Sequence, residues 1–98
     1  MNNTTPTEFR LNPRYDTRKS FYNKAVELYH DDGRIELRSY STIVACITDS
    51  LTAPMTAEVY GWYSNTTGRH IKEFLKQHGF KAESKSQILK DYCKEEGR

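Results

Sequence analysis

Apolar and polar residues alternate along the first half of the chain, with the period of two that is typical of strands with one buried face. Within residues 20–30, Tyr22, Val26 and Leu28 share one parity. Residues 31–33 (Asp-Asp-Gly) follow, and these residue types are those of tight turns. We therefore expect a first strand that enters a hairpin.

A second run with a period of two follows this turn. Its odd-numbered apolar residues point one way: Ile35, Leu37, Ile43, Ala45 and Ile47. Ser39 and Ser41 interrupt this apolar face, so we expect a bend or bulge there. Residues 49–54 form a second loop, and residues 55–63 resume strand character, with Gly61 as a bulge or close-approach point. Three antiparallel strands in a meander are the economical interpretation.

The period changes from two to about 3.6 at Ser64, which indicates the start of a helix. The apolar stripe of this helix consists of Ile71, Phe74, Leu75 and His78. Gly79 and Phe80 then occupy the positions where a glycine of positive φ and an apolar residue end a helix. The hydroxyls of residues 64–67 favour capping of the helix start, with an anion site as the weaker alternative.

A second helix begins at Ser84, which forms a capping box with Gln87. Its apolar stripe consists of Ile88, Leu89, Tyr92 and Cys93. Residues 1–14 hold two prolines and few large apolar side chains, which predicts a flexible leader. The predicted fold class is therefore α+β: a three-stranded antiparallel meander followed by two helices packed on one face, in a single domain of residues 15–98.

A length of 98 residues limits the chain to one small core. Hydrophobic residues make up 36% of the chain and aromatic residues 12%, which is enough for a compact domain. The formal net charge of +2 is far from the dense basic excess of a dedicated duplex binder. The longest apolar run, residues 43–47, is too short to span a membrane. Cys46 and Cys93 have no metal or redox spacing, so we expect reduced thiols in a cytoplasmic setting.

Charge is uneven along the chain, because the strands are acidic and the helical half is basic. The candidate nucleic-acid-binding residues are Arg14, Arg18 and Lys19 before the first strand, and Arg69, Lys72 and Lys76 on the first helix. The helical three lie at i, i+3 and i+7, and such a ridge can track phosphates. The alternative for the first group is a solubilising leader. The alternative for the helical group is a solvated helix face on which Arg69 pairs with Glu73 at i, i+4.

Three aromatic residues, Tyr40, Tyr60 and Trp62, have the parity of the outer face of the sheet. Large aromatic side chains left in water are typical of protein-binding hot spots, and they can also stack on bases. The alternative is cross-strand packing that stiffens a small sheet. We take these three residues as the candidate protein-binding surface.

The three histidines, His30, His70 and His78, lack the spacing of metal ligands, and no carboxylate cluster accompanies them. We therefore expect no metal and no cofactor. A domain of this size has little room for both a core and a catalytic pocket, so we expect no enzymatic activity. A small toxin-like ribonuclease that uses His70 is the least favoured class.

Two segments, residues 15–25 (YDTRKSFYNKA) and residues 63–79 (YSNTTGRHIKEFLKQHG), mark a resemblance. They resemble a family of short uncharacterised proteins of phages, plasmids and mobile chromosomal islands of Gram-positive bacteria. The resemblance covers residues 15–80 and does not reach the segment beyond Phe80. It implies a genomic setting and supplies no catalytic residue.

This setting and the sequence together lead to a functional expectation. We expect a non-enzymatic mobile-element protein that binds a host protein or nucleoprotein complex, one form of which is an anti-CRISPR-type inhibitor. Near-zero net charge and tyrosine-rich strands fit a protein surface better than bare DNA. The alternative is direct nucleic-acid binding by the basic helical half, with the helices on either side of residues 79–83 imitating a helix-turn-helix. We expect no membrane partner.

Overall fold

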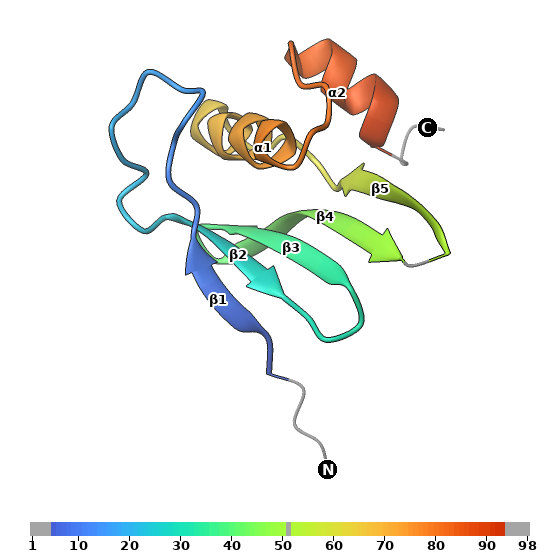
Figure 1. Ribbon diagram of the computed structural model, residues 1–98. Coiled ribbons are helices and arrows are strands. Elements are labelled where there is room, and N and C mark those ends of the chain that lie inside the picture. The colour runs from blue at the N-terminus through green and yellow to red at the C-terminus, as the bar shows by residue number, and fades with distance from the viewer. Residues whose placement is uncertain (1–4, 51, 94–98) are drawn as a thin grey trace.

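Five antiparallel strands form one sheet in the order β1-β2-β3-β4-β5, and two helices follow along the chain. A computed structural model describes residues 5–50 and 52–93. Its elements are β1 (Thr7–Arg10), β2 (Ala25–Tyr29), β3 (Arg34–Ser39), β4 (Thr42–Ser50), β5 (Ala53–Val59), α1 (Asn65–Gln77) and α2 (Lys85–Tyr92). Both helices lie above the same face of the sheet (Figure 1). The arrangement is α+β, but the expected count of three strands is wrong.

One of the two extra strands arises because the strand expected over residues 35–47 is divided. β3 and β4 meet at the two-residue turn Tyr40-Ser41, on either side of which Ser39 pairs with Thr42. Tyr40 has a φ of 58°, in the left-handed region. Since neither Gly, Asn nor Asp marks this turn, periodicity alone continues the strand through it.

The other extra strand lies in the segment expected to be a flexible leader. β1 pairs with β2 along the edge of the sheet, and Pro6 and Pro13 flank it without interrupting its ladder. The next residue, Leu11, is buried in the core, and its N–H donates to the carbonyl of Ala25 at 2.9 Å. This segment is therefore part of the sheet and core from Thr7 onward. Residues 1–4 of the expected leader lie outside the described residues.

The last strand also ends earlier than expected. Tyr60 N–H donates to the carbonyl of Val44 at 2.8 Å just beyond β5, and the chain then turns toward α1. Trp62 and Tyr63, which were expected within a strand over residues 55–63, therefore lie in the connection to the helix. Tyr63 has a φ of 66°, which ends the extended conformation.

The core lies between the sheet and the two helices. Its largest fully buried side chains include Phe74, Leu37, Ile47, Ile71, Leu75 and Ile88. The apolar stripe predicted for the first helix is confirmed at Ile71, Phe74 and Leu75. His78 differs from this stripe because it is the C-cap residue of α1, and its Nε2 lies 2.9 Å from Oε2 of Glu27 on β2.

The end of α1 follows its sequence signature. Gly79 has a φ of 86°, and its N–H donates to the carbonyl of Lys76 at 3.1 Å. Phe80 N–H donates to the carbonyl of Leu75 at 2.9 Å. These two bonds form the Schellman motif, and Phe80 packs against the core as predicted.

The start of α2 also follows its capping signature. Ser84 Oγ accepts a hydrogen bond from the backbone N–H of Gln87 at 3.1 Å. The side chain of Gln87 accepts in return from the N–H of Glu83 at 2.6 Å, one residue before the cap. Both bonds satisfy donors near the helix start, so the helix begins where the sequence indicates.

Candidate functional site

A polar stripe of α1 holds the loop between β1 and β2 against the helix. Arg69, Glu73 and Gln77 lie at i, i+4 and i+8, so they share one side of the helix. Their partners on the loop run in the opposite direction along the chain: Asp16, then the backbone of residues 14–15, then the backbone of Asn12. We call this set of contacts the clamp.

Glu73 is the central contact of the clamp and is 1% exposed. Its carboxylate accepts hydrogen bonds from the backbone N–H groups of Arg14 at 2.7 Å and Tyr15 at 3.0 Å. It also accepts from Nε2 of Gln77 at 2.6 Å. The expected Arg69–Glu73 pair is therefore wrong, because Glu73 binds the loop instead. Arg69 forms its ion pair with Asp16 at 2.7 Å.

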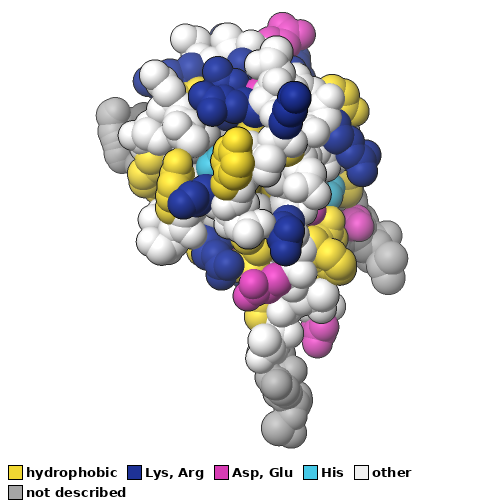
Figure 2. All heavy atoms as spheres, turned by 90° about the vertical axis from the view of Figure 1, so that its left-hand side faces the viewer, with side chains coloured by type: hydrophobic (Ala, Val, Ile, Leu, Met, Phe, Trp, Pro, Cys, Tyr) yellow, Lys and Arg dark blue, Asp and Glu magenta, His cyan; other side chains and the backbone are white. Residues whose placement is uncertain are grey.

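The clamp brings basic residues from distant parts of the chain onto one side of the molecule. This side of the molecule has two hollows. The cations that line them are Arg18, Lys24, Arg69, Lys72 and Lys76, and we call this surface the basic face. Figure 2 shows Lys and Arg side chains gathered over the side of the molecule that carries the loop and α1, with hydrophobic side chains between them. The sequence predicted one group of cations before the first strand and another on the first helix. Arg18 from the first group and Arg69 from the second line the same hollow.

The remaining predicted cations lie at the margins of the basic face. Arg14 lines a separate hollow with Gln77 and His78, near the end of α1. Lys19 is exposed beside Arg18 in the loop. Sequence reasoning missed Lys24, which follows the turn at Asn23 and lines the same hollow as Arg18.

The first hollow of the basic face encloses about 200 Å³, and we call it the tyrosine pocket. Its lining includes Arg18, Phe21, Tyr22, Lys24, Tyr40, Arg69 and His70. Tyr22 is 72% exposed and Tyr40 51% exposed, so both rings remain open to solvent. Lys24 Nζ lies 5.6 Å from the centroid of the Tyr40 ring, within the range of a cation–π contact.

His70 forms the base of the tyrosine pocket and is 1% exposed. Its Nδ1 is hydrogen-bonded to Ser39 Oγ at 2.8 Å, and the same hydroxyl lies 2.9 Å from Thr67 Oγ1. Its ring packs edge-on against Phe21, with centroids 4.6 Å apart. Burial lowers the pKa of His70, and the carboxylate of Asp16 partly opposes this shift. A neutral His70 therefore supports the pocket, and the positive charge comes from the surrounding Lys and Arg.

The second hollow lies along α1 and encloses about 270 Å³. Its lining includes Tyr15, Asp16, Trp62, Arg69, Lys72 and Lys76. Lys76 Nζ lies 6.0 Å from the centroid of the exposed Tyr15 ring. Arg69 lines both hollows, so the two form one continuous basic and aromatic surface.

The structure brings two of the three candidate protein-binding aromatics, Tyr40 and Trp62, onto the basic face, and Tyr60 lies apart from them. Tyr40 lines the tyrosine pocket, and Tyr60 follows the edge strand β5. Trp62 is partly buried against the core, and a Cβ on Gly68 of α1 would collide with its indole. The placement of Trp62 on the outer face of the sheet is therefore wrong, because the chain leaves the sheet just beyond Tyr60.

Tyr60 remains exposed at 39%, near Cys46 and Glu58. Burial of its hydroxyl, reinforced by Cys46 and Glu58, raises its pKa to about 12. Burial also raises the pKa of the Cys46 thiol. Both groups are therefore neutral at physiological pH. Neither Cys46 nor Cys93 forms a disulfide.

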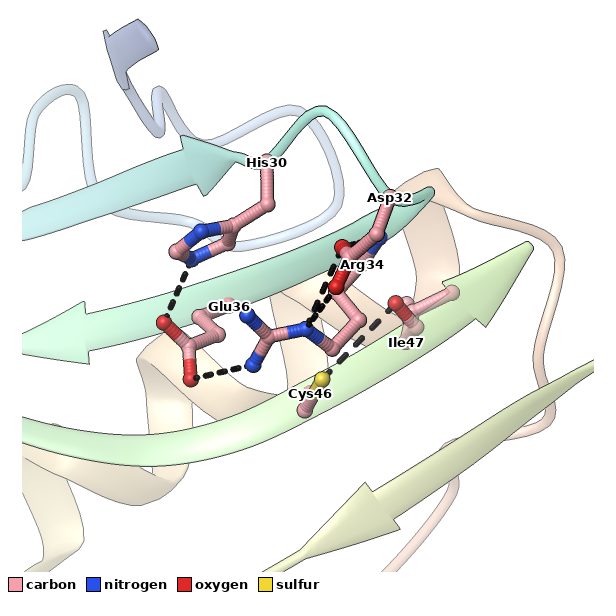
Figure 3. A network of polar contacts seen from close by, with 6 residues as sticks. All are labelled: His30, Asp32, Arg34, Glu36, Cys46 and Ile47. Atoms are coloured by element: carbon pink, nitrogen blue, oxygen red, sulfur yellow. Dashed lines mark hydrogen bonds and ion pairs between the residues drawn. The ribbon is translucent and has the colours of Figure 1, made fainter. Parts of the chain in front are cut away.

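Glu36 of β3 and Asp32 of the preceding turn both pair with Arg34, and Glu36 also contacts His30. Figure 3 shows Glu36 between His30 and Arg34, with Arg34 also reaching Asp32. His30 Nε2 lies 2.7 Å from one Glu36 oxygen, Arg34 Nη1 lies 3.6 Å from the other, and Arg34 Nε lies 3.0 Å from Asp32. Arg34 therefore offsets part of the charge of Asp32 and Glu36.

A further hollow, of about 560 Å³, lies between β1, β2 and the end of α1. Glu27 lines it and accepts from the hydroxyl of Tyr29 at 3.1 Å, while His78 contacts its other oxygen. Burial and the Glu27 charge raise the pKa of Tyr29 to about 12. Both carboxylate oxygens are thus engaged, and the described residues that line the hollow include no Ser, Thr or Cys. The arrangement joins β2 to α1.

Two further findings concern the described residues. Within residues 5–50 and 52–93, no group of three His, Cys, Asp or Glu residues is arranged to hold a metal ion. Neither described helix has the length and apolar character needed to cross a membrane.

The fold and the site define a small α+β domain with a basic, aromatic face assembled by a helix and a clamped loop. The chain belongs to the family of unknown function DUF8033, whose model matches residues 9–90. The match begins within β1 and continues into α2, so it includes a segment that the sequence resemblance did not reach. No curated protein and no solved structure matches the chain.

Proposed function

We propose that this chain is a non-enzymatic binding protein that engages nucleic acid through its basic face. The observation that carries the proposal is the clamp. Arg69, Glu73 and Gln77 hold the loop on α1, and cations from both segments then surround exposed tyrosines. Basic grooves interleaved with aromatic rings are typical of proteins that bind single-stranded nucleic acid.

The charges available on the basic face determine how such binding behaves. Four of the five cations line the face without an ion pair to a described residue; Arg69 is paired with Asp16. Each phosphate that a cation neutralises releases counterions, so the affinity falls with salt. With about four such contacts and a slope of roughly −0.7 per contact for single strands, affinity falls about 50-fold between 50 and 200 mM salt.

The geometry changes the order of the two functional hypotheses. The sequence favours a host protein in part because it predicts Tyr40, Tyr60 and Trp62 on the outer face of the sheet, whereas Tyr40 and Trp62 line the two hollows of the basic face. A nucleoprotein complex remains a second candidate, since Tyr60 is exposed away from the basic face and offers a separate contact for protein. The mobile-element origin, the anti-CRISPR-type inhibition and the cytoplasmic setting are proposals that rest on the sequence alone.

Charge reversal on the helix tests the proposed function. Lys72→Glu/Lys76→Glu leaves the clamp residues intact and should weaken binding of a fluorescent single strand at least tenfold at 50 mM salt. The matched control is Lys81→Glu/Lys90→Glu, which changes the net charge equally at exposed positions around α2. It should change the affinity less than about threefold.

Fluorescence anisotropy over a salt series provides the measurement. Wild-type binding that does not respond to salt would reject phosphate contacts as its basis. An equal loss of affinity in both variants would assign the effect to net charge and reject the basic face as the binding surface.

A further inference from the structure

Tyr22, which lines the tyrosine pocket, has a backbone conformation that ordinarily favours other residue types. Tyr22 and Asn23 are the central residues of a turn that the N–H of Lys24 closes on the carbonyl of Phe21 at 2.9 Å. Both have positive φ, 52° and 65°. Turns with two such residues select Gly, Asn and Asp. Asn23 fits this rule and Tyr22 does not, because its Cβ is crowded by the backbone in this region.

Tyr40 repeats the exception in a second turn. It is the first central residue between β3 and β4, where a positive φ ordinarily selects glycine. The N–H of Tyr40 donates to the carbonyl of Lys24 at 2.7 Å, which joins the two turns. Two turns thus present strained tyrosines to one pocket. Backbone strain of this kind clusters at ligand-binding sites, where the surrounding structure holds it in place.

Core packing does not account for these two tyrosines, since both rings are mostly exposed. The rings instead line a pocket of about 200 Å³ together with Arg18, Lys24 and Arg69. This volume is below the ~300–1,000 Å³ of sites for drug-sized ligands, so it suits a single planar ring system. The pocket therefore combines flat stacking surfaces with positive charge around its rim.

We infer that the tyrosine pocket accepts one unpaired base of a single-stranded nucleic acid. The base stacks on the rings of Tyr22 and Tyr40, and the phosphates on either side of it contact Arg18, Lys24 and Arg69. This inference rests on the proposed function and specifies its ligand. Every base has a flat face, so the pocket selects an unpaired strand without selecting a sequence.

The surroundings of α1 favour a single strand over a duplex. The Ile71, Phe74 and Leu75 stripe packs toward the sheet, and the clamp binds the loop along another side of the helix. Figure 1 shows α1 above the sheet, with this loop running beside it. A helix bordered in this way is poorly placed to enter a major groove about 12 Å wide, as the helix-turn-helix alternative requires. Duplex bases are also stacked internally and do not reach surface rings.

The test is a variant that relieves the strain and removes both rings. Tyr22→Asn/Tyr40→Gly gives each turn a residue that suits positive φ, so the melting temperature should stay constant or rise by about 5 °C. Binding of a fluorescent oligothymidylate of about 12 nucleotides should weaken about 5- to 150-fold, the effect of losing one stacked base. Tyr22→Phe/Tyr40→Phe retains both rings and should bind within about twofold of wild type.

Tyr63 provides a matched control. It also has positive φ, is 60% exposed, and is absent from the lining of the tyrosine pocket. Tyr63→Asn should therefore relieve strain in the same way and leave oligothymidylate binding unchanged. A loss of binding in Tyr63→Asn equal to that of the double variant would overturn the assignment of the base to this pocket.

An abasic strand of the same length tests the base directly, using the wild-type protein alone. It carries the same phosphates without bases, so its affinity should be about 5- to 150-fold weaker than that of oligothymidylate. An oligouridylate of equal length tests whether ribose is also accepted, and a duplex of equal length should bind more weakly than either unpaired strand. Equal affinities for oligothymidylate and the abasic strand would overturn the inference, whatever the fold of the variants.

The outcomes separate this inference from the proposed function. If oligothymidylate, abasic strand and duplex bind equally and Lys72→Glu/Lys76→Glu abolishes all three, the basic face binds nucleic acid and the pocket takes no base. If wild type binds none of the three at low salt, the proposed function fails, and the inference fails with it. If wild type prefers oligothymidylate to the abasic strand and only Tyr22→Asn/Tyr40→Gly loses this preference, the result supports both the inference and the proposed function.

Discussion

Two stripes of α1 contribute to the molecule in different ways. The apolar stripe of Ile71, Phe74 and Leu75 packs into the core between helix and sheet. The polar stripe of Arg69, Glu73 and Gln77 binds loop residues that lie 53 to 65 positions earlier in the chain. The first stripe stabilises the fold, whereas the second also determines where the cations of the loop lie. The comparison shows that the site depends on tertiary polar contacts within an otherwise ordinary amphipathic helix.

The largest effect should come from the apolar stripe. Phe74→Ala removes the largest fully buried side chain, so it should destabilise the protein by about 3–5 kcal/mol through lost burial and the cavity left behind. Urea unfolding followed by circular dichroism measures this change. Phe74→Leu should cost distinctly less, because more of the volume is retained. A destabilisation below about 1 kcal/mol in Phe74→Ala would contradict the assignment of this stripe to the core.

A smaller and more local effect should follow from the polar stripe. Glu73→Ala leaves the N–H groups of Arg14 and Tyr15 without their carboxylate partner, at a cost of about 2–3 kcal/mol. Loop release should precede global unfolding, so trypsin should cleave after residues 14, 18 and 19 faster than in wild type. Glu83→Ala, at an exposed position, should change stability by less than about 0.5 kcal/mol.

Oligothymidylate affinity adds a second measurement on Glu73→Ala under conditions where the protein is folded. Release of the loop should reduce the affinity, because Arg18 then leaves the basic face. Unchanged trypsin sensitivity together with unchanged affinity would contradict the role of the clamp in assembling the site.

The difference between the two stripes explains what the sequence could predict. Ile71, Phe74 and Leu75 recur at helical spacing, and Gly79 ends the helix with a residue type that the backbone demands. Burial and positive φ select residue types directly, so these features were predicted correctly. Glu73 carried no such signal, because its partners are backbone N–H groups that belong to every residue alike.

The same reasoning applies to the missed strands and the pocket. The turn at Tyr40 divides a predicted strand, and its residue type gives no sign of positive φ. Asn23 is a turn residue within the first predicted strand, and it was the available signal for the turn beside Tyr22. β1 is short and lies at the edge, with a repeat too brief for periodicity to identify. The site is therefore marked by tyrosines whose positive φ departs from the usual preference for Gly, Asn or Asp. Rules based on residue type could not predict it.

The smallest expected effect concerns His70, the buried histidine of α1 at the base of the tyrosine pocket. Burial lowers its pKa below the ordinary value of 6.5, so the unfolded chain binds a proton at a higher pH than the folded protein does. Stability from this group is fully present above pH 6.5 and is lost as the pH falls toward the folded-state pKa. The free energy of unfolding should therefore decrease between pH 7.5 and pH 5 (~2.5 pH units) and His70 should contribute to that slope.

His70→Asn isolates this contribution, because the amide has no titration in this range and can still hydrogen-bond to Ser39. Urea unfolding at several pH values should show a shallower decrease for His70→Asn than for wild type. The pairs His30–Glu36 and His78–Glu27 are present in both proteins, so their contributions cancel in the comparison. Identical slopes would mean that His70 binds its proton equally well in the folded protein, which its buried bond to Ser39 and its packing on Phe21 oppose.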